Sequence, residues 1–288
     1  MSGEKLPQST EELTSILRPE HELLGATIAP IRDGGVLIPL SYGKQEYEQA
    51  AFSDSVALSD LSGVSITLVS KAPASLFAEM SFAGKRLKVG ECDFEAVLAG
   101  DATLMGIVLL ARTGDSEYTC WCADQRAELI FSWLTFLSKI EQADKRPFEG
   151  IEVADVSSRL LPLLLAGPDA RAILTDYIGD QSLPDPGHSK NLLLDTVVCL
   201  VTSLPKTAEP AFLILVPPAF SRIFWRSLLS FPSVQPVGRK AVRNWAGDSF
   251  SWLSWIDTPE RVIRSSADLL SAGLIRTQGG FIGARGLS

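Results

Sequence analysis

The sequence predicts an α+β fold built from two domains with a similar order of elements. Short apolar runs alternate with helical segments along the chain, and several neighbouring runs are close enough to form hairpins. A charged stretch with Pro147 and Gly150 divides the chain near its middle, as is typical of a domain boundary. We therefore expect a leader over residues 1–20, a first α+β domain over 21–145 and a second over 151–288.

The first half of the chain alternates strand and helix signals. The leader is expected to hold a short helix from Thr10. The expected strands cover residues 36–40, 64–70 and 90–98, and the expected helices cover 45–52 and 72–80.

Residues 100–133 give the clearest local pattern. A buried run over 107–111 and an alternating strand over 117–122 flank a hairpin turn at Thr113-Gly114-Asp115. Asp124 can cap the helix that follows, over 124–141. A site built here would lie where the strands end and the helix begins.

The second half repeats the order of the first. A strand-like segment over 153–165 meets Ala166-Gly167-Pro168, which begins a helix over 169–177. A polar loop follows over 179–190. The remaining expected elements are strands over 192–202 and 211–216 and a helix over 219–229. The repeated order indicates a pseudo-duplicated pair of domains.

Composition limits the classes of partner. The chain has 26 basic and 34 acidic residues, a net charge of −8 and 46% apolar residues. This balance is typical of a globular protein and argues against sequence-independent binding of nucleic acid, which needs clustered cations. The longest apolar runs, 160–167 and 192–203, are too short to cross a bilayer. The polar N-terminal residues do not resemble a signal peptide, and four cysteines make no disulfide framework. We expect a cytoplasmic protein whose partners are small molecules or proteins.

Several common kinds of site are not supported by the sequence. His21 and His188 are the two histidines, and no Gly-x-Ser-x-Gly elbow is present, so a Ser–His–Asp hydrolase is not expected. No GxGxxG or Walker motif occurs. Cys120 and Cys122 would share one face of a strand and could begin a metal site. No further ligand is evident beside them, so we favour a buried core position.

Other candidate residues leave two interpretations open. Asp60 could be a site carboxylate or a turn residue that bonds its own backbone, and its spacing favours the turn. Trp245, Trp252 and Trp255 could stack on a planar ligand, although core or interface positions are more common at this spacing. The glycine-rich residues 279–283 could approach a ligand or simply form a loop. None of these signals alone identifies a reaction.

Taken in order over residues 18–285, the chain resembles the glycine cleavage T-protein (aminomethyltransferase) family of folate-binding proteins. The matching motifs are His21-x-x-Leu24-Gly25-Ala26 with Pro39, Tyr42 and Glu46; Ser59-Asp60-Leu61-Ser62; Leu87-Lys88-Val89-Gly90 with Asp93-Phe94; Asp155-Val156-Ser157-Ser158-Arg159; Leu165-Ala166-Gly167-Pro168-Asp169-Ala170-Arg171; Thr207-Ala208-Glu209 with Phe212; Val216-Pro217; Gly238-Arg239 with Arg243 and Ala246-Gly247; and Phe281-Ile282-Gly283. The resemblance implies two interleaved α+β domains around a central folate-binding channel. A small C-terminal β-barrel usually follows in the family, and we expect it to be absent here.

The resemblance also implies tetrahydrofolate as the cofactor. Glu209 would accept hydrogen bonds from pterin N–H groups, and an arginine would meet the carboxylates of the folate glutamate. The candidate cofactor-binding residues are Glu209, Arg239, Arg243, Arg126, Asp60, Cys122 and Met105.

The sequence departs from the family at the positions linked to catalysis. Active members carry an acidic pair in a G-G-x-x-D-D motif, which is thought to orient or protonate the folate-bound group. Laid on that motif, the chain places Met105 and Gly106 at the acidic pair, and a thioether cannot transfer a proton. Asp101 is the nearby acid, some four residues early. An asparagine of the family becomes Cys122, and a glutamate becomes Trp245.

We therefore predict a tetrahydrofolate-binding protein that resembles an aminomethyl or methyl transferase and has little or no turnover in the ordinary reaction. A family branch linked to iron–sulfur maintenance has a cysteine where this chain has Gly280, so that activity is not expected. One alternative is a non-catalytic folate-binding regulator. Another is a structural subunit of a demethylase or oxidoreductase complex, with Trp252 and Trp255 on a partner surface.

Overall fold

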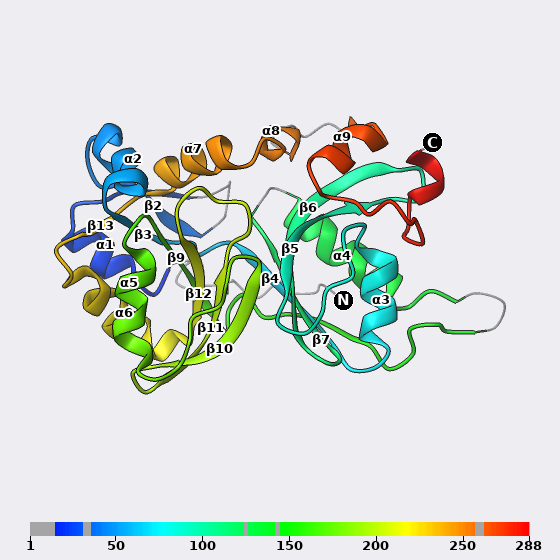
Figure 1. The fold of residues 1–288 in the computed structure, drawn as a ribbon, viewed down its shortest axis with the longest axis horizontal. Helices are drawn as coiled ribbons and strands as arrows, with labels where there is room; N and C mark the ends of the chain where they lie inside the picture. The colour runs from blue at the N-terminus through cyan, green and yellow to red at the C-terminus, as the bar shows by residue number, and fades with distance from the viewer. Residues whose placement is uncertain (1–14, 31–35, 124–125, 142–144, 257–261, 288) are drawn as a thin grey trace, which may run out of the picture.

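The protein folds into two sheets with helices packed on them. The computed structural model describes residues 15–30, 36–123, 126–141, 145–256 and 262–287. The expected helix from Thr10 and the expected cap at Asp124 lie outside these residues. Within them, the strands form two six-stranded sheets that lie side by side and one separate hairpin (Figure 1). The mixture of sheets and helices confirms the predicted α+β class.

The first sheet carries strands from both halves of the chain. Its order is β10-β11-β12-β9-β3-β13, and all neighbours are antiparallel except β13 and β3. Its strands are β3 (Val56–Asp60), β9 (Leu161–Ala166), β10 (His188–Leu194), β11 (Val197–Ser203), β12 (Ala211–Val216) and β13 (Val234–Pro236). The central β9 and β12 are buried along their whole length, as their continuous apolar sequences predict.

The second sheet is antiparallel. Its order is β14-β6-β7-β4-β8, and β5 also pairs with β6. Its strands are β4 (Ser65–Ser70), β5 (Cys92–Leu98), β6 (Thr103–Gly114), β7 (Glu117–Cys122), β8 (Glu152–Asp155) and β14 (Val262–Ile263). The separate hairpin joins β1 (Thr27–Pro30) to β2 (Leu37–Ser41).

Helices pack on the sheets and cross between them. They are α1 (Arg18–Leu23), α2 (Gln45–Asp54), α3 (Ala74–Ser81), α4 (Ala127–Leu137), α5 (Ala170–Ile178), α6 (Pro218–Leu229), α7 (Arg239–Ser249), α8 (Leu253–Ile256), α9 (Ser266–Ser271) and the 3₁₀ turn η2 (Ala284–Leu287). Figure 1 shows α7 and α8 along one edge of the molecule, running from the first sheet toward the second. In the described part of the chain, none of the helices combines the length and apolar character needed to cross a bilayer.

The two sheets are built from repeats that exchange a strand. One repeat runs β4-α3-β5-β6-β7-α4 and the other β9-α5-β10-β11-β12-α6, and the first strand of each pairs with the last. The strand before each repeat crosses over, since β3 pairs with β9 and β8 pairs with β4. Both expected domains therefore contribute strands to both sheets, and the charged stretch near Pro147 does not separate the sheets.

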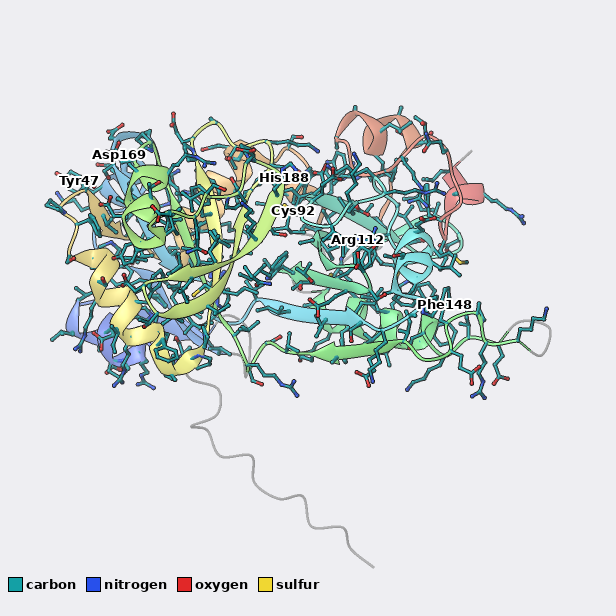
Figure 2. The ribbon with its side chains drawn as sticks, turned by 60° about the horizontal axis from the view of Figure 1, so that its bottom comes forward. Tyr47, Cys92, Arg112, Phe148, Asp169 and His188 are labelled. Atoms are coloured by element: carbon teal, nitrogen blue, oxygen red, sulfur yellow. The ribbon has the colours of Figure 1, made fainter. Side chains whose placement is uncertain are left out.

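The sheets also meet where β5 and β10 begin. The backbone N–H of Cys92 donates to the carbonyl of Gly187 at 2.8 Å, and the N–H of Ser189 donates to the carbonyl of Gly90 at 2.7 Å. Figure 2 shows Cys92 and His188 close together at this junction. These backbone bonds and the exchanged strands fix the relative position of the two sheets.

Three expected strands have different bounds in the structure. The single strand expected over 192–202 is wrong, because residues 188–203 form a hairpin that turns after Leu194. Asp195 adopts a φ of +54° in this turn. The turn was not expected because the residues on both sides of Asp195 form one nearly continuous apolar run. The segment 153–165 is likewise divided into β8 and β9, and the run over 107–111 is the middle of the longer β6.

The packed chain begins before His21. Ser15 is 5% exposed, and Leu17 is fully buried in the core of the first sheet. Residues 15–20 are therefore part of the fold, although the sequence places them in a leader. The apolar pair Ile16-Leu17 is too short to signal burial by itself, which is why the sequence places these residues in a leader.

Glu95 on β5 is a buried acid with an unusual environment. Its side chain is 1% exposed, and one carboxyl oxygen accepts from the N–H of Gly84 at 3.1 Å. The other oxygen has no hydrogen-bond partner in the described residues. Burial raises the pKa of Glu95 to about 8, although the Gly84 hydrogen bond opposes this. The folded protein therefore holds a proton that the unfolded chain releases at lower pH.

We expect the stability of the protein to fall as pH rises from about 4.5 to about 8. The slope contributed by Glu95 is at most about 1.4 kcal/mol per pH unit, because only the folded state binds the proton in this window. Glu95→Gln should remove this slope in urea denaturation at several pH values. Glu149→Gln, at an exposed position, should keep it. Parallel pH profiles for the wild type and Glu95→Gln would contradict the assignment.

Candidate functional site

A cavity of about 280 Å³ lies between the two sheets, beneath α7 and α8. Strands β5, β6 and β7 of the second sheet and β9 and β12 of the first contribute to its wall. The lining residues are Leu61, Val64, Phe94, Ile107, Leu109, Trp121, Ala123, Leu164, Leu204, Leu213, Arg239, Val242, Arg243, Trp245, Ala246, Trp252, Leu253 and Ile256. Among these described residues, two arginines supply all the charge. A small, mostly apolar cavity with a few polar groups is typical of a ligand site.

Arg239 is the polar residue that the fold positions most closely. It is the first residue of α7, and the N–H of Gly238 before it donates to the buried Glu48 carboxylate at 2.6 Å. The other Glu48 oxygen accepts from the N–H of Tyr42 at 2.8 Å and that of Gly43 at 3.1 Å. Glu48 thus ties the start of α7 to the end of β2, which fixes where the Arg239 side chain begins.

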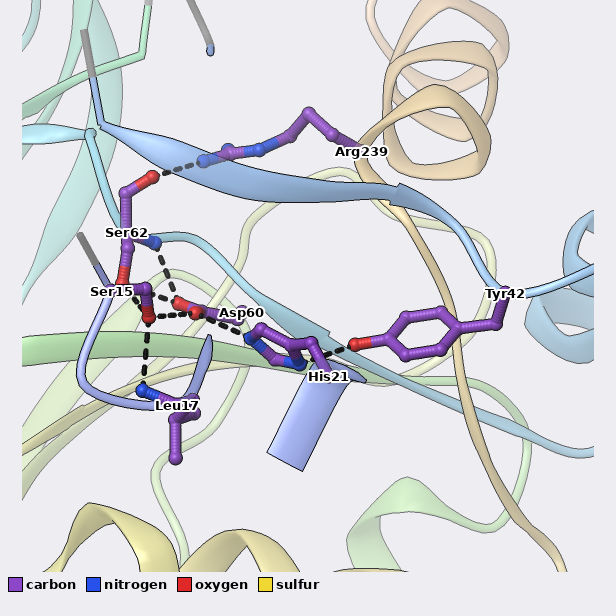
Figure 3. A network of polar contacts seen from close by, with 7 residues as sticks. All are labelled: Ser15, Leu17, His21, Tyr42, Asp60, Ser62 and Arg239. Carbon is purple, nitrogen blue, oxygen red and sulfur yellow. Dashed lines mark hydrogen bonds and ion pairs between the residues drawn. The ribbon is translucent and has the colours of Figure 1, made fainter. Parts of the chain in front are cut away.

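The guanidinium of Arg239 is only partly satisfied. Its Nη2 donates to the carbonyl of Ser62 at 2.7 Å (Figure 3). Its Nε is buried and meets no acceptor in the described part of the chain. Burial lowers the pKa of Arg239 to about 10, and the nearby charge of Asp60 opposes this. A partly buried cation with a buried, unused N–H favours an anionic ligand, since pairing would offset its lost hydration.

Asp60 anchors the turn that carries Ser62. One Asp60 oxygen accepts from the Ser62 N–H at 2.8 Å and from its hydroxyl at 2.6 Å. The other accepts from the Ser15 hydroxyl at 2.5 Å and lies 2.9 Å from Nε2 of His21 (Figure 3). The His21 Nδ1 lies 2.6 Å from the hydroxyl of Tyr42. The turn interpretation of Asp60 is therefore confirmed.

The charge of Asp60 is stabilised inside the protein. Burial by itself raises the pKa of Asp60, but the hydrogen bond and charge of His21 and the hydroxyls of Ser15 and Ser62 outweigh it, so the pKa is lowered. Asp60 is 1% exposed and does not line the cavity. Its effect on the site passes through the turn, whose carbonyl at Ser62 holds Arg239.

The second repeat contains an equivalent turn with a different environment. An oxygen of Asp155 accepts from the N–H of Ser157 at 2.9 Å and from its hydroxyl at 2.5 Å. Asp155 ends β8 as Asp60 ends β3, and each turn leads from a crossing strand into the first strand of a repeat. Asp155 is exposed, whereas Asp60 is buried. The pair therefore allows one turn to be compared with the other.

Four of the expected residues gather at the cavity. Arg239 and Arg243, expected from the resemblance, both line it, as do Trp245 and Trp252, which the sequence left between ligand and core positions. Trp255 does not line it and lies against the guanidinium of Arg264, 4.9 Å from the ring centre.

Met105 and Cys122, expected to bind the cofactor, do not line this cavity. Both belong to the apolar cluster between the second sheet and helices α3 and α4. A register irregularity in the pairing of β5 with β6 puts Leu104, rather than Met105, in the same cluster as Ile107 and Trp252. Cys120 shares the cluster with Cys122, so the expected common face is confirmed.

The remaining candidates also lie away from the cavity lining. Glu209 is exposed in a separate surface groove. Arg126 donates to the carbonyl of Leu104 at 3.0 Å, and Asp101 accepts from the N–H of Thr103 at 3.0 Å in the turn before β6. No group of three or more His, Cys, Asp or Glu side chains arranged to hold a metal ion occurs among the described residues.

Two aromatic residues of the cavity were not expected from the sequence. Phe94 packs against Trp252 with ring centres 5.0 Å apart, and Trp121 is 4% exposed. The alternation of residues 117–122 contains the signal for Trp121, because it places that residue opposite Cys120 and Cys122. Which face of β7 meets the cavity depends on where the first sheet packs, and strand alternation does not record this.

Comparison with known proteins identifies the family. The family model described as GCVT N-terminal domain matches residues 17–246. A curated aminomethyltransferase from Chlorobium chlorochromatii is 24% identical over 229 residues, which cover 77% of this chain and 60% of that protein. The chain thus spans about 60% of the length of this curated relative.

A solved aminomethyltransferase structure shows the same fold. The crystal structure of glycine cleavage system aminomethyltransferase T from Bartonella henselae matches with a TM-score of 0.76 and 21% identity, over 95% of this chain and 73% of that one. A heterotetrameric sarcosine oxidase from Corynebacterium matches with a TM-score of 0.45 and 18% identity, over 65% of this chain and 89% of that one. This chain belongs to the GCVT N-terminal domain family and has the fold of an aminomethyltransferase.

Proposed function

We propose that this protein binds a folate-type ligand, an organic anion with an aromatic body, in its central cavity and does not transfer one-carbon groups. The observation that carries the proposal is the Arg239 guanidinium, held by Ser62 on one side and left with a buried, unused N–H at an otherwise apolar cavity. A carboxylate is the acceptor that suits a guanidinium best. Phe94, Trp121 and Trp252 provide aromatic surface for the body of the ligand.

Tetrahydrofolate fits part of this cavity. Arg239 and Arg243 match the carboxylates of its glutamate, and the aromatic lining matches its benzoyl ring. Its pterin ring carries N–H donors, and no carboxylate is among the described residues that line the cavity. Glu209, the acceptor expected from the resemblance, lines the exposed groove. Bound tetrahydrofolate would supply the acceptor of a one-carbon group.

The binding proposal is tested by calorimetric titration of the full chain. Tetrahydrofolate and p-aminobenzoylglutamate, which lacks the pterin, should each bind saturably, because both present carboxylates and a benzoyl ring. Glu209→Ala should leave the affinity of p-aminobenzoylglutamate unchanged, since Glu209 lies outside the cavity lining. If neither compound binds, the proposal is wrong.

We expect no measurable aminomethyl transfer. The residues at the start of β6, Leu104, Met105 and Gly106, carry no group that can transfer a proton. Asp101 accepts from the N–H of Thr103 in the exposed turn before the strand and does not line the cavity. An assay with aminomethylated carrier protein and tetrahydrofolate should release ammonia no faster than a control without the protein. Release that depends on the protein and on tetrahydrofolate would refute this.

We propose as a second candidate that the protein is a subunit of a complex. The apolar side chains of Leu129 and Phe136 on α4 are 44% and 59% exposed, and exposed apolar faces favour protein contacts. Native mass measurement on protein purified from its source should give a mass above that of one chain. A lone chain would contradict this role. Fractionation of the source cells would test the expected cytoplasmic location.

A further inference from the structure

Trp245 stands between the central cavity and a second hollow. It lines the cavity with Arg239 and Arg243, and it also lines the surface groove that contains Glu209. Its ring stacks on Phe52 with centres 5.1 Å apart and an interplanar angle of 10°, and Phe250 meets it edge-on at 6.2 Å. The Trp245 ring is therefore part of the wall that separates the two spaces, and the rings of Phe52 and Phe250 hold it in place.

The two spaces differ in chemistry. The cavity presents arginines and apolar side chains, whereas the groove presents the carboxylates of Glu46, Glu209 and Asp248. The groove also contains Gln49, whose side-chain oxygen is buried and has no partner in the described residues. The cavity thus suits a ligand's anionic end, and the groove suits a group that donates hydrogen bonds.

We propose that Trp245 determines which part of a folate-type ligand is recognised: it closes the cavity off from the groove, so that the benzoyl ring and the glutamate bind and the pterin ring stays outside without a protein partner. The proposal rests on the proposed function, since it assumes that the cavity binds a folate-type anion. A pterin ring has several N–H donors, and burying it in an apolar space without acceptors would cost more than its contacts return. The acceptors that would satisfy those donors lie beyond Trp245, in the groove.

The inference predicts how a pair of matched ligands will bind. Folic acid and p-aminobenzoylglutamate share the benzoyl ring and the glutamate, and only folic acid has the pterin. In the wild type the pterin should add nothing, so the two dissociation constants should agree within about threefold. Glu209→Gln in the wild-type background should leave this ratio unchanged, because Trp245 keeps Glu209 out of the cavity.

Removing the wall should change the preference. Trp245→Ala should join the cavity to the groove, so that folic acid binds about tenfold more tightly than p-aminobenzoylglutamate, the effect of one hydrogen bond to a charged acceptor. The double variant Trp245→Ala with Glu209→Gln should lose most of this gain. Trp252→Ala is the matched control, because Trp252 lines the cavity but not the groove. It should weaken both ligands and keep their ratio.

Calorimetric titrations of the full chain distinguish the outcomes. The wild-type ratio needs no variant, so it tests the proposal even if Trp245→Ala does not fold. Tighter binding of folic acid by the wild type, reduced in Glu209→Gln, would overturn the role of Trp245 while leaving folate-type binding intact. An unchanged ratio in folded Trp245→Ala would also overturn it. Failure of both ligands to bind any variant would instead remove the proposed function on which the inference rests.

Discussion

Replacing Asp60 by alanine should lower the free energy of unfolding by about 3–5 kcal/mol, because several buried groups would lose their hydrogen-bond partner at about 1–3 kcal/mol each. His21 would keep a buried ring nitrogen without its acceptor, since both side chains are almost fully buried. The hydroxyl of Ser15 and the N–H of Ser62 would lose their acceptor as well. Urea denaturation at neutral pH, followed by circular dichroism, measures this loss.

Asp155→Ala is the control for the loss of the turn itself. Asp155 accepts the same two bonds from Ser157 that Asp60 accepts from Ser62, but Asp155 is exposed. We expect a loss of less than about 1 kcal/mol there, because water replaces the missing acceptor.

The stabilisation that Asp60 provides should depend on pH. Because the pKa of Asp60 is lowered on folding, this stabilisation is present above the pKa of the unfolded state and is lost as pH falls through the pKa of the folded state. Equal losses of stability in Asp60→Ala and Asp155→Ala would contradict the stabilising role of the buried Asp60.

Arg239→Met should weaken the binding of p-aminobenzoylglutamate by about 10- to 100-fold, because hydrogen bonds between charged groups contribute about 1.5–3 kcal/mol each. Methionine keeps an apolar stem at the start of α7 and removes both the charge and the donors. Arg239→Lys should lie between the wild type and Arg239→Met, since it keeps the charge but cannot bond Ser62 and a ligand with a planar fork.

The control for Arg239 is its exposed neighbour. Lys240 does not line the cavity, so Lys240→Met removes one positive charge from the same helix turn without touching the site. Its affinity should stay within about twofold of the wild type. Similar losses in Lys240→Met and Arg239→Met would mean that general charge attraction, and not a contact with Arg239, explains binding. Thermal melts of each variant confirm that it is folded.

Local patterns predicted the elements that depend on local sequence. Strict alternation over residues 117–122 predicted a strand, and β7 has these bounds. The apolar run over 211–216 predicted the fully buried β12 in the same way. The glycine at position 167, in contrast, is required by a contact distant in sequence. Its φ is +137°, and a Cβ there would lie 2.2 Å from the carbonyl oxygen of Ser55, so only glycine allows the chain to start α5 beside β3.

The exchange of strands between the repeats could not be read from periodicity. β3 and β8 have the same kind of sequence whichever sheet they join, and their partners are chosen by contacts distant in sequence. The His21–Asp60 pair has the same character, because its members are 39 residues apart and neither carries a local signal of pairing. The resemblance implied interleaved domains, and the sequence patterns alone did not.

Only part of the site could be predicted, because its lining also depends on contacts between residues distant in sequence. The helix N-terminus at Arg239 follows from a matched motif, and the structure places its side chain at the cavity. Glu209 matches a motif equally well, yet Trp245 lies between it and the cavity. Met105 was assigned by laying the chain on a family motif, and the register irregularity between β5 and β6 puts Leu104 rather than Met105 in the cluster that contains Ile107 and Trp252. A motif match identifies candidate residues, whereas tertiary packing decides which of them line the same cavity.

The most direct test of the central claim is a crystal structure of the full chain with p-aminobenzoylglutamate. We expect the ligand between the two sheets, with a carboxylate oxygen within hydrogen-bond distance of Nε of Arg239 and the benzoyl ring against Phe94, Trp121 or Trp252. Trp245 should still stack on Phe52 in that complex. Density for the ligand in the groove beside Glu209, with the central cavity empty, would contradict the account.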